Sequence, residues 1–200
     1  MAGTTIREKP DGAEEIGKLG FSDLVRVLHD HTDPQVRQYA AYLLGKENNH
    51  RAIQSLIKAL ADSDKSVRKQ AMLALSSIGK AAVEPLAEAM KEPRWETRYR
   101  AAEALGKIAD KQAVLPLIHG LKDNRDHVRY MSAKGLQNIR HPGAVEPLIL
   151  LLRDENIYVR LMAIHALSAQ EGETGKAALN EALGSEQDEN VRAAIAASLQ

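Results

Sequence analysis

The chain has 200 residues, and its 27 Lys and Arg balance 27 Asp and Glu, so the formal net charge is zero. Proteins dedicated to nucleic acids usually carry an excess of basic residues that neutralises phosphates, and the balance here disfavours that class. The sequence contains no Cys, which excludes disulfides, thiolate metal sites and cysteine nucleophiles within it.

The N-terminal residues predict no targeting or membrane segment. Residues 1–12, MAGTTIREKPDG, include Pro10 and Gly12 and are expected to form a disordered or weakly ordered tail. The longest aliphatic run, LILLL at 148–152, is too short to cross a bilayer. We therefore expect a cytoplasmic protein without a membrane partner.

Beyond the tail, the sequence repeats with a period of about 31 residues. An Arg, preceded by Val in all but one case, recurs at Arg37, Arg68, Arg98, Arg129, Arg160 and Arg192, with steps of 31, 30, 31, 31 and 32. Prolines recur in step at Pro85, Pro116 and Pro147. Such a period is typical of stacked repeats. We expect one domain over 13–200, built of units at about 13–50, 51–80, 81–110, 111–141, 142–173 and 174–200.

Each unit is predicted to be a pair of helices. The first segments, at 53–61, 83–91, 114–122 and 145–153, have apolar residues spaced as on one helical face. In the second segments the apolar stripe runs from the Val through small residues to Leu, as in Val67, Ala71, Ala74 and Leu75. Gly45, Gly79 and Gly106 stand where helix C-caps are expected. A pair of this size cannot bury its own stripe, so the units must stack.

The pattern AVxPLxxxLxDxxxxVRxxAxxALGxI resembles the HEAT-like repeat, especially the short type named after the phycobilisome lyases, over about 22–200. The resemblance implies an all-α fold, an α-solenoid forming a right-handed superhelix of about six hairpins. It also implies that the second helices line a concave face.

The recurring Arg is interpreted as a structural ladder. Each guanidinium is expected to bond a turn acid or turn carbonyls next door, because its planar fork makes several directed bonds while its stem packs on apolar neighbours. Five residues before the Val, an acid stands in every unit but the first, which has His31; the acids are Asp62, Glu92, Asp123, Asp154 and Glu186. The alternative is a phosphate-binding stripe of Arg68, Lys69, Arg98, Arg100, Arg129 and Lys134.

Positions two, five and six after the Val point away from the predicted core and carry residues unusual for a solvated face. We expect a protein partner to bind along this surface, because exposed aromatic and apolar patches usually mark interaction sites. The predicted partner-binding residues are Tyr42, Lys69, Leu73, Tyr99, Glu103, Tyr130, Lys134, Leu161 and His165. The alternative is that positions five and six, such as Met72 and Ile164, pack against the next repeat.

Two other features stay open. Trp95 is either an exposed anchor or a plug between helices, and a plug is favoured because tryptophans are mostly buried. Leu150 and Leu151 exceed what one helix face needs, which hints at a surface for weak self-association.

No catalytic, cofactor or metal motif is found. The seven His do not combine into a ligand set at helical spacing. No His is followed by Glu, unlike the paired motifs of the HEAT-like deoxyhypusine hydroxylases, and the single Trp and balanced charge disfavour a HEAT-like DNA glycosylase. We therefore expect no catalytic residues, no cofactor and no metal.

The sequence leaves three functions open. The main expectation is a non-catalytic scaffold or adaptor, not an enzyme, which binds a protein in the groove lined by the second helices. The first alternative is a HEAT-like lyase or assembly-factor subunit that acts on a tetrapyrrole-bearing protein. The second alternative is a nucleic-acid or phosphate binder that uses the basic stripe.

Overall fold

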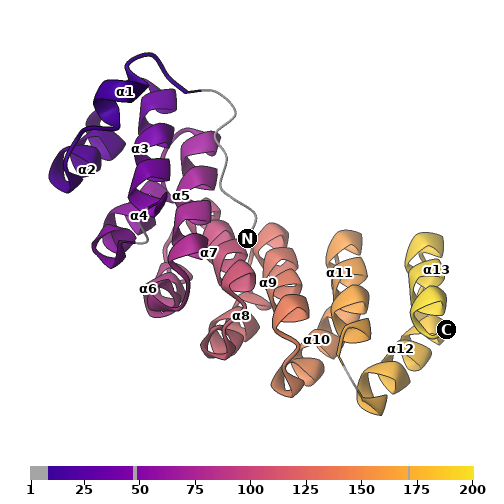
Figure 1. Ribbon diagram of the computed structural model, residues 1–200. Helices are drawn as coiled ribbons and strands as arrows, with labels where there is room; N and C mark the ends of the chain where they lie inside the picture. Colours follow the sequence, from indigo (N-terminus) through magenta and orange to yellow (C-terminus); the bar gives the residue numbers. More distant parts are fainter. Residues whose placement is uncertain (1–8, 47–48, 171) are drawn as a thin grey trace. The chain divides into compact units, whose positions relative to one another are not determined.

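The computed structural model describes residues 9–46, 49–170 and 172–200, and every regular element in these ranges is helical (Figure 1). The all-α fold expected from the sequence is confirmed. The predicted tail at 1–12 falls largely on residues 1–8, which lie outside the described residues. The chain divides into two compact units, one up to Ala104 and the other from Leu105. The superhelical path of the array therefore stays a prediction.

The first unit contains a short helix followed by three helix pairs, the last of which reaches into the second unit. Its helices are α1 (Ala13–Ile16), α2 (Phe21–Asp30), α3 (Pro34–Lys46), α4 (Ile53–Ala59), α5 (Lys65–Ile78), α6 (Val83–Ala89) and α7 (Trp95–Ile108). Short 3-10 turns, η1 (His50–Ala52) and η2 (Gly79–Ala82), lead into α4 and α6.

The second unit begins inside α7 and adds three more pairs. Its helices are α8 (Val114–Gly120), α9 (Asp126–Ile139), α10 (Val145–Leu150), α11 (Ile157–Ser168), α12 (Glu173–Ser185) and α13 (Glu189–Ser198). The 3-10 turns here are η3 (Lys111–Ala113), η4 (Pro142–Ala144) and η5 (Leu151–Arg153). Within this unit α11 lies between α9 and α13 (Figure 1).

The apolar stripes meet inside each pair. Val67, Ala71 and Leu75 of α5 are fully buried, as are Leu56 of α4 and Leu60, the residue that follows α4. Each buried Leu contributes roughly 1.5–3 kcal/mol through removal of its side chain from water. The same register buries Val128 and Val159 in the second unit. The hydrophobic period of the sequence therefore determines which face of each helix turns inward.

Side-chain caps and prolines determine where the helices begin. The Asp64 carboxylate accepts hydrogen bonds from the N–H groups of Ser66 and Val67, which begin α5. Asn156 caps α11 and Asp188 caps α13 in the same way. Pro85 is the third residue of α6, where a missing N–H breaks no intrahelical bond.

Two of the three glycines predicted as C-caps have a different role. Gly79 does end α5, with φ at 76°. Gly45 lies inside α3 instead, and a Cβ there would come within 2.4 Å of the Ala74 Cβ on α5. Gly106 lies inside α7, and a Cβ there would meet the Gly135 Cα at 2.6 Å. The second helices of successive repeats touch backbone to backbone at these points. The sequence pattern of a single hairpin did not predict this contact, because it joins two hairpins.

The recurring arginines join successive turns. The Nε and Nη2 of Arg129 donate to the two carboxylate oxygens of Asp154, at 2.7 and 2.9 Å, while Nη1 donates to the Asp123 carbonyl of its own turn. Arg37 does the same with Asp62 and with the carbonyls of its own turn. Each of these guanidiniums therefore holds two turns at once, from a largely buried position.

Arg160 makes the third link of this kind, to the Glu186 carboxylate at 2.9 and 3.2 Å. Arg68 and Arg98 also bond carbonyls of their own turn through Nη1, and Arg192 bonds the Leu183 and Glu186 carbonyls. The predicted partners Asp62, Asp154 and Glu186 are thus brought to an arginine of the preceding repeat.

The linking carboxylates serve two purposes. One oxygen of Asp62 also accepts the Asp64 backbone N–H at 2.8 Å, and Glu186 accepts from Asp188 in the same manner. Burial acts to raise the pKa of the Asp62 carboxyl, but the hydrogen bonds from Arg37 and Asp64 and the nearby guanidinium charges outweigh it. The pKa of Asp62 is therefore lowered. The same balance, with Asp188 and Arg160 as donors, lowers the pKa of Glu186.

A first prediction concerns the contact between second helices. Gly45→Ala should lower the free energy of unfolding by about 1–3 kcal/mol, because the added Cβ meets backbone that cannot turn aside. Gly184→Ala is the matched control: it lies in α12 with no atom within 4 Å of the added Cβ, and should raise stability by about 0.5–1 kcal/mol. Urea unfolding measures both, and equal effects would refute the close contact.

A second prediction concerns the ladder. Arg129→Ala should destabilise the protein by about 2–4 kcal/mol, because it leaves a buried Asp154 carboxylate and a turn carbonyl without their donor. Arg153→Ala removes an exposed pair with Glu181 at 3.3 Å and should cost less than about 1 kcal/mol. Thermal unfolding followed by circular dichroism compares them. A melting temperature unchanged by Arg129→Ala would contradict the structural role.

A third prediction follows from the lowered pKa of Asp62. A carboxyl whose pKa is lower in the folded state stabilises the fold above its unfolded pKa, about 4, and this contribution is lost as the pH falls below that value. The stability difference between wild type and Asp62→Asn should therefore be full at pH 7 and shrink between about pH 4 and pH 2. Urea unfolding across this range tests it; a difference that grows on acidification would have the wrong sign.

Candidate functional site

The second helices of the first unit carry a mixed aromatic and charged surface. Five predicted partner-binding residues lie here, on α3, α5 and α7: Tyr42, Lys69, Leu73, Tyr99 and Glu103. Lys69 is exposed, and the other four are half-buried. The surface is thus formed by side chains held in part by their neighbours, which reduces the entropy lost when a ligand covers them.

Local contacts fix two tyrosines of this surface. Tyr42 stacks on the buried Tyr39, with ring centroids 5.9 Å apart. Tyr99 meets Trp95 edge-on at 6.4 Å, and the Arg100 guanidinium lies 5.1 Å from the Tyr99 ring centroid. Trp95 is therefore half-buried against a neighbouring aromatic ring, between the two alternatives that the sequence left open.

Arg100 is a residue of this surface that sequence reasoning assigned only to a phosphate stripe. Its Nη1 donates to the Glu103 carboxylate at 2.6 Å, and both side chains are 20% exposed. The cluster of Trp95, Tyr99, Arg100 and Glu103 thus combines a cation, an anion and two rings on one helix. The i, i+4 aromatic spacing and the i, i+3 charge spacing were the signals that could have revealed it.

The second unit carries the remaining predicted residues on α9 and α11. Tyr130 and Leu161 are half-buried, whereas Lys134 and His165 are exposed. Gln137 of α9 donates to the His165 carbonyl at 3.4 Å, which links the two helices beside this face. The second unit therefore presents a similar mixture on its own second helices.

Position five after the Val belongs to the interior. Met72 is 1% exposed and Ile164 is fully buried, so both pack within their units, as the alternative interpretation of the sequence held. A continuous basic stripe is also disfavoured: Arg129 is buried against Asp154, and Arg100 is paired with Glu103. The surface suits a ligand that is partly apolar better than a polyphosphate.

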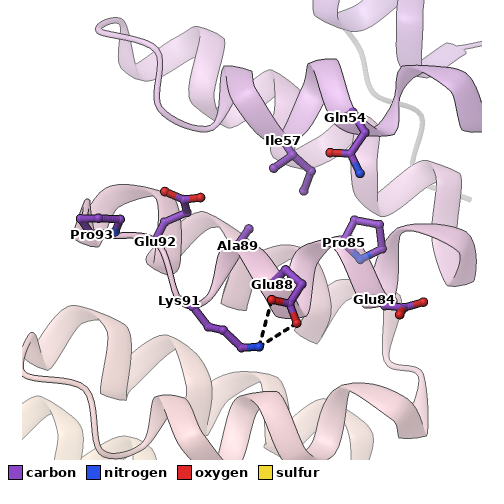
Figure 2. Close-up of a pocket in the computed structure, with 9 residues that line it drawn as sticks. All are labelled: Gln54, Ile57, Glu84, Pro85, Glu88, Ala89, Lys91, Glu92 and Pro93. Carbon is purple, nitrogen blue, oxygen red and sulfur yellow. Dashed lines mark hydrogen bonds and ion pairs between the residues drawn. The ribbon is translucent and has the colours of Figure 1, made fainter.

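Each unit also has a hollow on its first helices. In the first unit, a hollow of about 550 Å³ lies between α4 and α6, with Ile57 and Pro85 on its apolar side (Figure 2). Glu84, Glu88 and Glu92 border it, and Lys91 pairs with Glu88 at 2.7 Å. In the second unit, a hollow of similar size lies between α10 and α12. Leu150 borders it and is 67% exposed, whereas Leu151 is buried.

The described residues contain neither a metal-binding cluster nor a membrane-spanning helix. No group of three or more His, Cys, Asp or Glu is placed to hold a metal ion in that part of the chain. No helix there is both long and apolar enough to span a membrane.

Comparison with known proteins identifies the repeats. The family model of HEAT repeats matches residues 21–106, 83–149 and 114–200, which together run from 21 to 200. The designed armadillo repeat protein YIII(Dq)4CqI is similar in fold, with a TM-score of 0.54 at 23% identity over 90% of this chain and 98% of that one.

Two similar proteins have a named activity. The structure of the complex of CpcE and CpcF of phycocyanin lyase from Nostoc sp. PCC7120 contains a chain that matches with a TM-score of 0.70 and 26% identity, over 76% of this chain and 100% of that one. Phycocyanobilin lyase subunit alpha of Picosynechococcus sp. is 37% identical over 102 residues. That alignment covers 46% of this chain but only 38% of the relative.

The comparisons correct one expectation. The sequence indicated a protein that is not an enzyme, and the two relatives contradict this, because both are named as parts of lyases. The error has a physical reason: on a repeat array, functional side chains can come from several helices, so no contiguous motif needs to mark them. The chain belongs to the HEAT-repeat family, with repeats of the phycobilisome-lyase type.

Proposed function

We propose that the chain is a subunit of a bilin lyase, which acts with a protein partner on the attachment of phycocyanobilin to phycocyanin. One observation carries the proposal: 26% identity and a TM-score of 0.70 over the full length of a chain in the CpcE–CpcF complex. The 37% identical segment of a phycocyanobilin lyase subunit supports it independently.

The second-helix surface of the first unit supplies chemistry that suits such a pigment. An open-chain tetrapyrrole is long, flat and conjugated, and it bears two carboxylates. The half-buried rings of Tyr42 and Tyr99 offer faces for stacking, and Leu73 occupies on α5 the same repeat position as Tyr42 on α3. Lys69, which is exposed on the same surface, offers positive charge for a carboxylate.

The role of the chain would be to hold and orient the pigment. The 200 residues contain no Cys, so within them no thiol can carry the bilin covalently. The attachment point then lies on the client protein, and the surface described above would present the pigment to it. The same face of the second unit, with Tyr130 and Leu161, would contact a protein partner.

The proposal predicts a coloured covalent product. The chain, a complementary lyase subunit, phycocyanobilin and phycocyanin apoprotein should together give a pigment band that stays with the apoprotein on a denaturing gel. Omitting the chain should remove most of the band. If no combination of complementary subunits gives a product that depends on this chain, the lyase assignment is wrong.

A second assay tests whether the pigment binds at the surface that contains Tyr99. Tyr99→Ala should slow product formation about tenfold, because an aromatic anchor of this kind contributes roughly 1–2 kcal/mol. Leu115→Ala is the matched control: it removes an exposed apolar side chain from α8, a first helix, and should leave the rate unchanged. Circular dichroism verifies that both variants are folded. A full rate for Tyr99→Ala would keep the lyase assignment but place the pigment elsewhere.

A further inference from the structure

One link of the arginine ladder is open. Arg68 is anchored like the linking arginines: its Nη1 donates to the Asp62 and Ser63 carbonyls of its own turn at 2.7 and 2.8 Å. In Arg37, Arg129 and Arg160 the same anchoring turns the Nε and Nη2 edge toward a carboxylate, at 2.7–3.2 Å. Among the described residues, no carboxylate occupies that edge of Arg68.

Glu92, the acid of the next turn, does not lie at this edge of Arg68. Glu92 is exposed and borders the hollow between α4 and α6, beside Pro93 (Figure 2). The predicted pairing of Arg68 with Glu92 is therefore not formed, and only the Glu92 carbonyl takes part in the ladder, as an acceptor for Arg98. In the closed links the acid also accepts the backbone N–H of the residue two positions later, as Asp62, Asp154 and Glu186 do. In the turn of Glu92, the residue between these two positions is Pro93.

A second guanidinium lies at the same turn. Arg94 reaches back 33 residues, and its Nη1 donates to the Ala61 carbonyl at 2.9 Å. Arg68 and Arg94 therefore bond three consecutive carbonyls, those of residues 61–63. Shared anchoring on so short a segment keeps the two positive groups close together.

The carboxylate of Asp62, whose carbonyl Arg68 bonds, is already engaged. Both oxygens of Asp62 accept from Arg37, at 2.8 and 2.9 Å, and one also accepts the Asp64 N–H. Neither Arg68 nor Arg94 has an ion-pair partner among the residues that the structure describes. Two neighbouring guanidiniums repel each other, and a bound anion removes this repulsion while satisfying the donors that remain.

We propose that Arg68 and Arg94 form a binding site for a carboxylate of another molecule. The chemistry of the ligand follows from the three closed links, in which an identically anchored fork binds a carboxylate through Nε and Nη2. Arg68 is half-buried, so its interaction with an anion is screened less than on an open surface. The site extends beyond the proposed lyase function and does not depend on it. The carboxylate comes either from an acidic side chain of a protein or from a propionate of a tetrapyrrole.

The direct test is an NMR titration of the protein labelled with 15N-arginine, with citrate as the probe. Citrate should shift the Nε–Hε signal of Arg68 at millimolar concentration, whereas that of Arg129, whose edge is occupied, should move little. Arg94→Gln should weaken the response of Arg68 at least threefold. Arg26→Gln, which removes an exposed guanidinium paired with Asp23 on α2, is the matched control and should change nothing.

Three results would overturn the proposal. Arg68 could fail to respond to citrate, or sodium chloride at equal ionic strength could shift it equally. The third is a change of the Arg68 signal in Glu92→Gln without any ligand, which would show that Glu92 closes the link in solution. All three are read from folded protein and need no lyase activity, so they are separate from a failure of the lyase assay.

A second arm identifies the source of the carboxylate. Phycocyanobilin with free propionates should shift Arg68 if the pigment is the ligand, and its dimethyl ester should not. If phycocyanin apoprotein shifts Arg68 and the free pigment does not, the carboxylate belongs to a protein side chain. Either pattern supports the site, and a response to the ester equal to that of the free acid contradicts recognition of a carboxylate.

Discussion

A guanidinium that holds the carbonyls of one turn and the carboxylate of the next is the contact on which the spacing of the repeats depends. The hydrophobic stripes alone do not fix the offset between neighbouring repeats, because Ala and Leu side chains tolerate small shifts between helices. Arg37, Arg129 and Arg160 fix the position with bonds that have direction as well as strength. Because they act from largely buried positions, water and salt weaken them little.

This fixed spacing allows second helices to meet at their backbones. Gly45 faces Ala74 and Gly106 faces Gly135 at distances that leave no room for a further carbon atom. Side chains at positions two and six after the Val lie on the other side of these helices, where Tyr42, Tyr99 and Lys69 form a surface. The small residues and the candidate functional surface therefore lie on different sides of the same helices.

The fold could be predicted from the sequence because the pattern of one helix pair, with its recurring Arg, occurs six times. The Val, Ala and Leu register of 67–75 gave the buried face, and the turn acids gave the partners of Arg37, Arg129 and Arg160. The roles of Gly45 and Gly106 could not be predicted, because they depend on contacts between hairpins, which the period of a single helix does not contain. Glu92 does not pair with Arg68 as the repeat pattern predicted, and its turn differs locally from the others by the proline that follows it.

The functional face was harder to predict than the fold. Tyr99 was identified as an unusual outward residue, but its contacts with Trp95 and Arg100 depend on side-chain rotamers that spacing alone does not determine. Met72 and Ile164 show the converse, since outward positions on a single helix become interior ones once a neighbour is stacked. The repeat pattern as a whole indicated a relationship to lyases, but no local catalytic motif marks the activity, so a lyase subunit was only one of the three alternatives that the sequence left open.

The linking pairs have one more property, the nearly constant sequence separation of their members. Arg37 to Asp62, Arg129 to Asp154 and Arg160 to Glu186 span 25, 25 and 26 residues. Duplication or loss of a whole hairpin would preserve this separation, whereas an insertion inside a hairpin would change it. The array can therefore lengthen or shorten in evolution by complete modules without altering how far along the chain an arginine lies from the acid of the next turn.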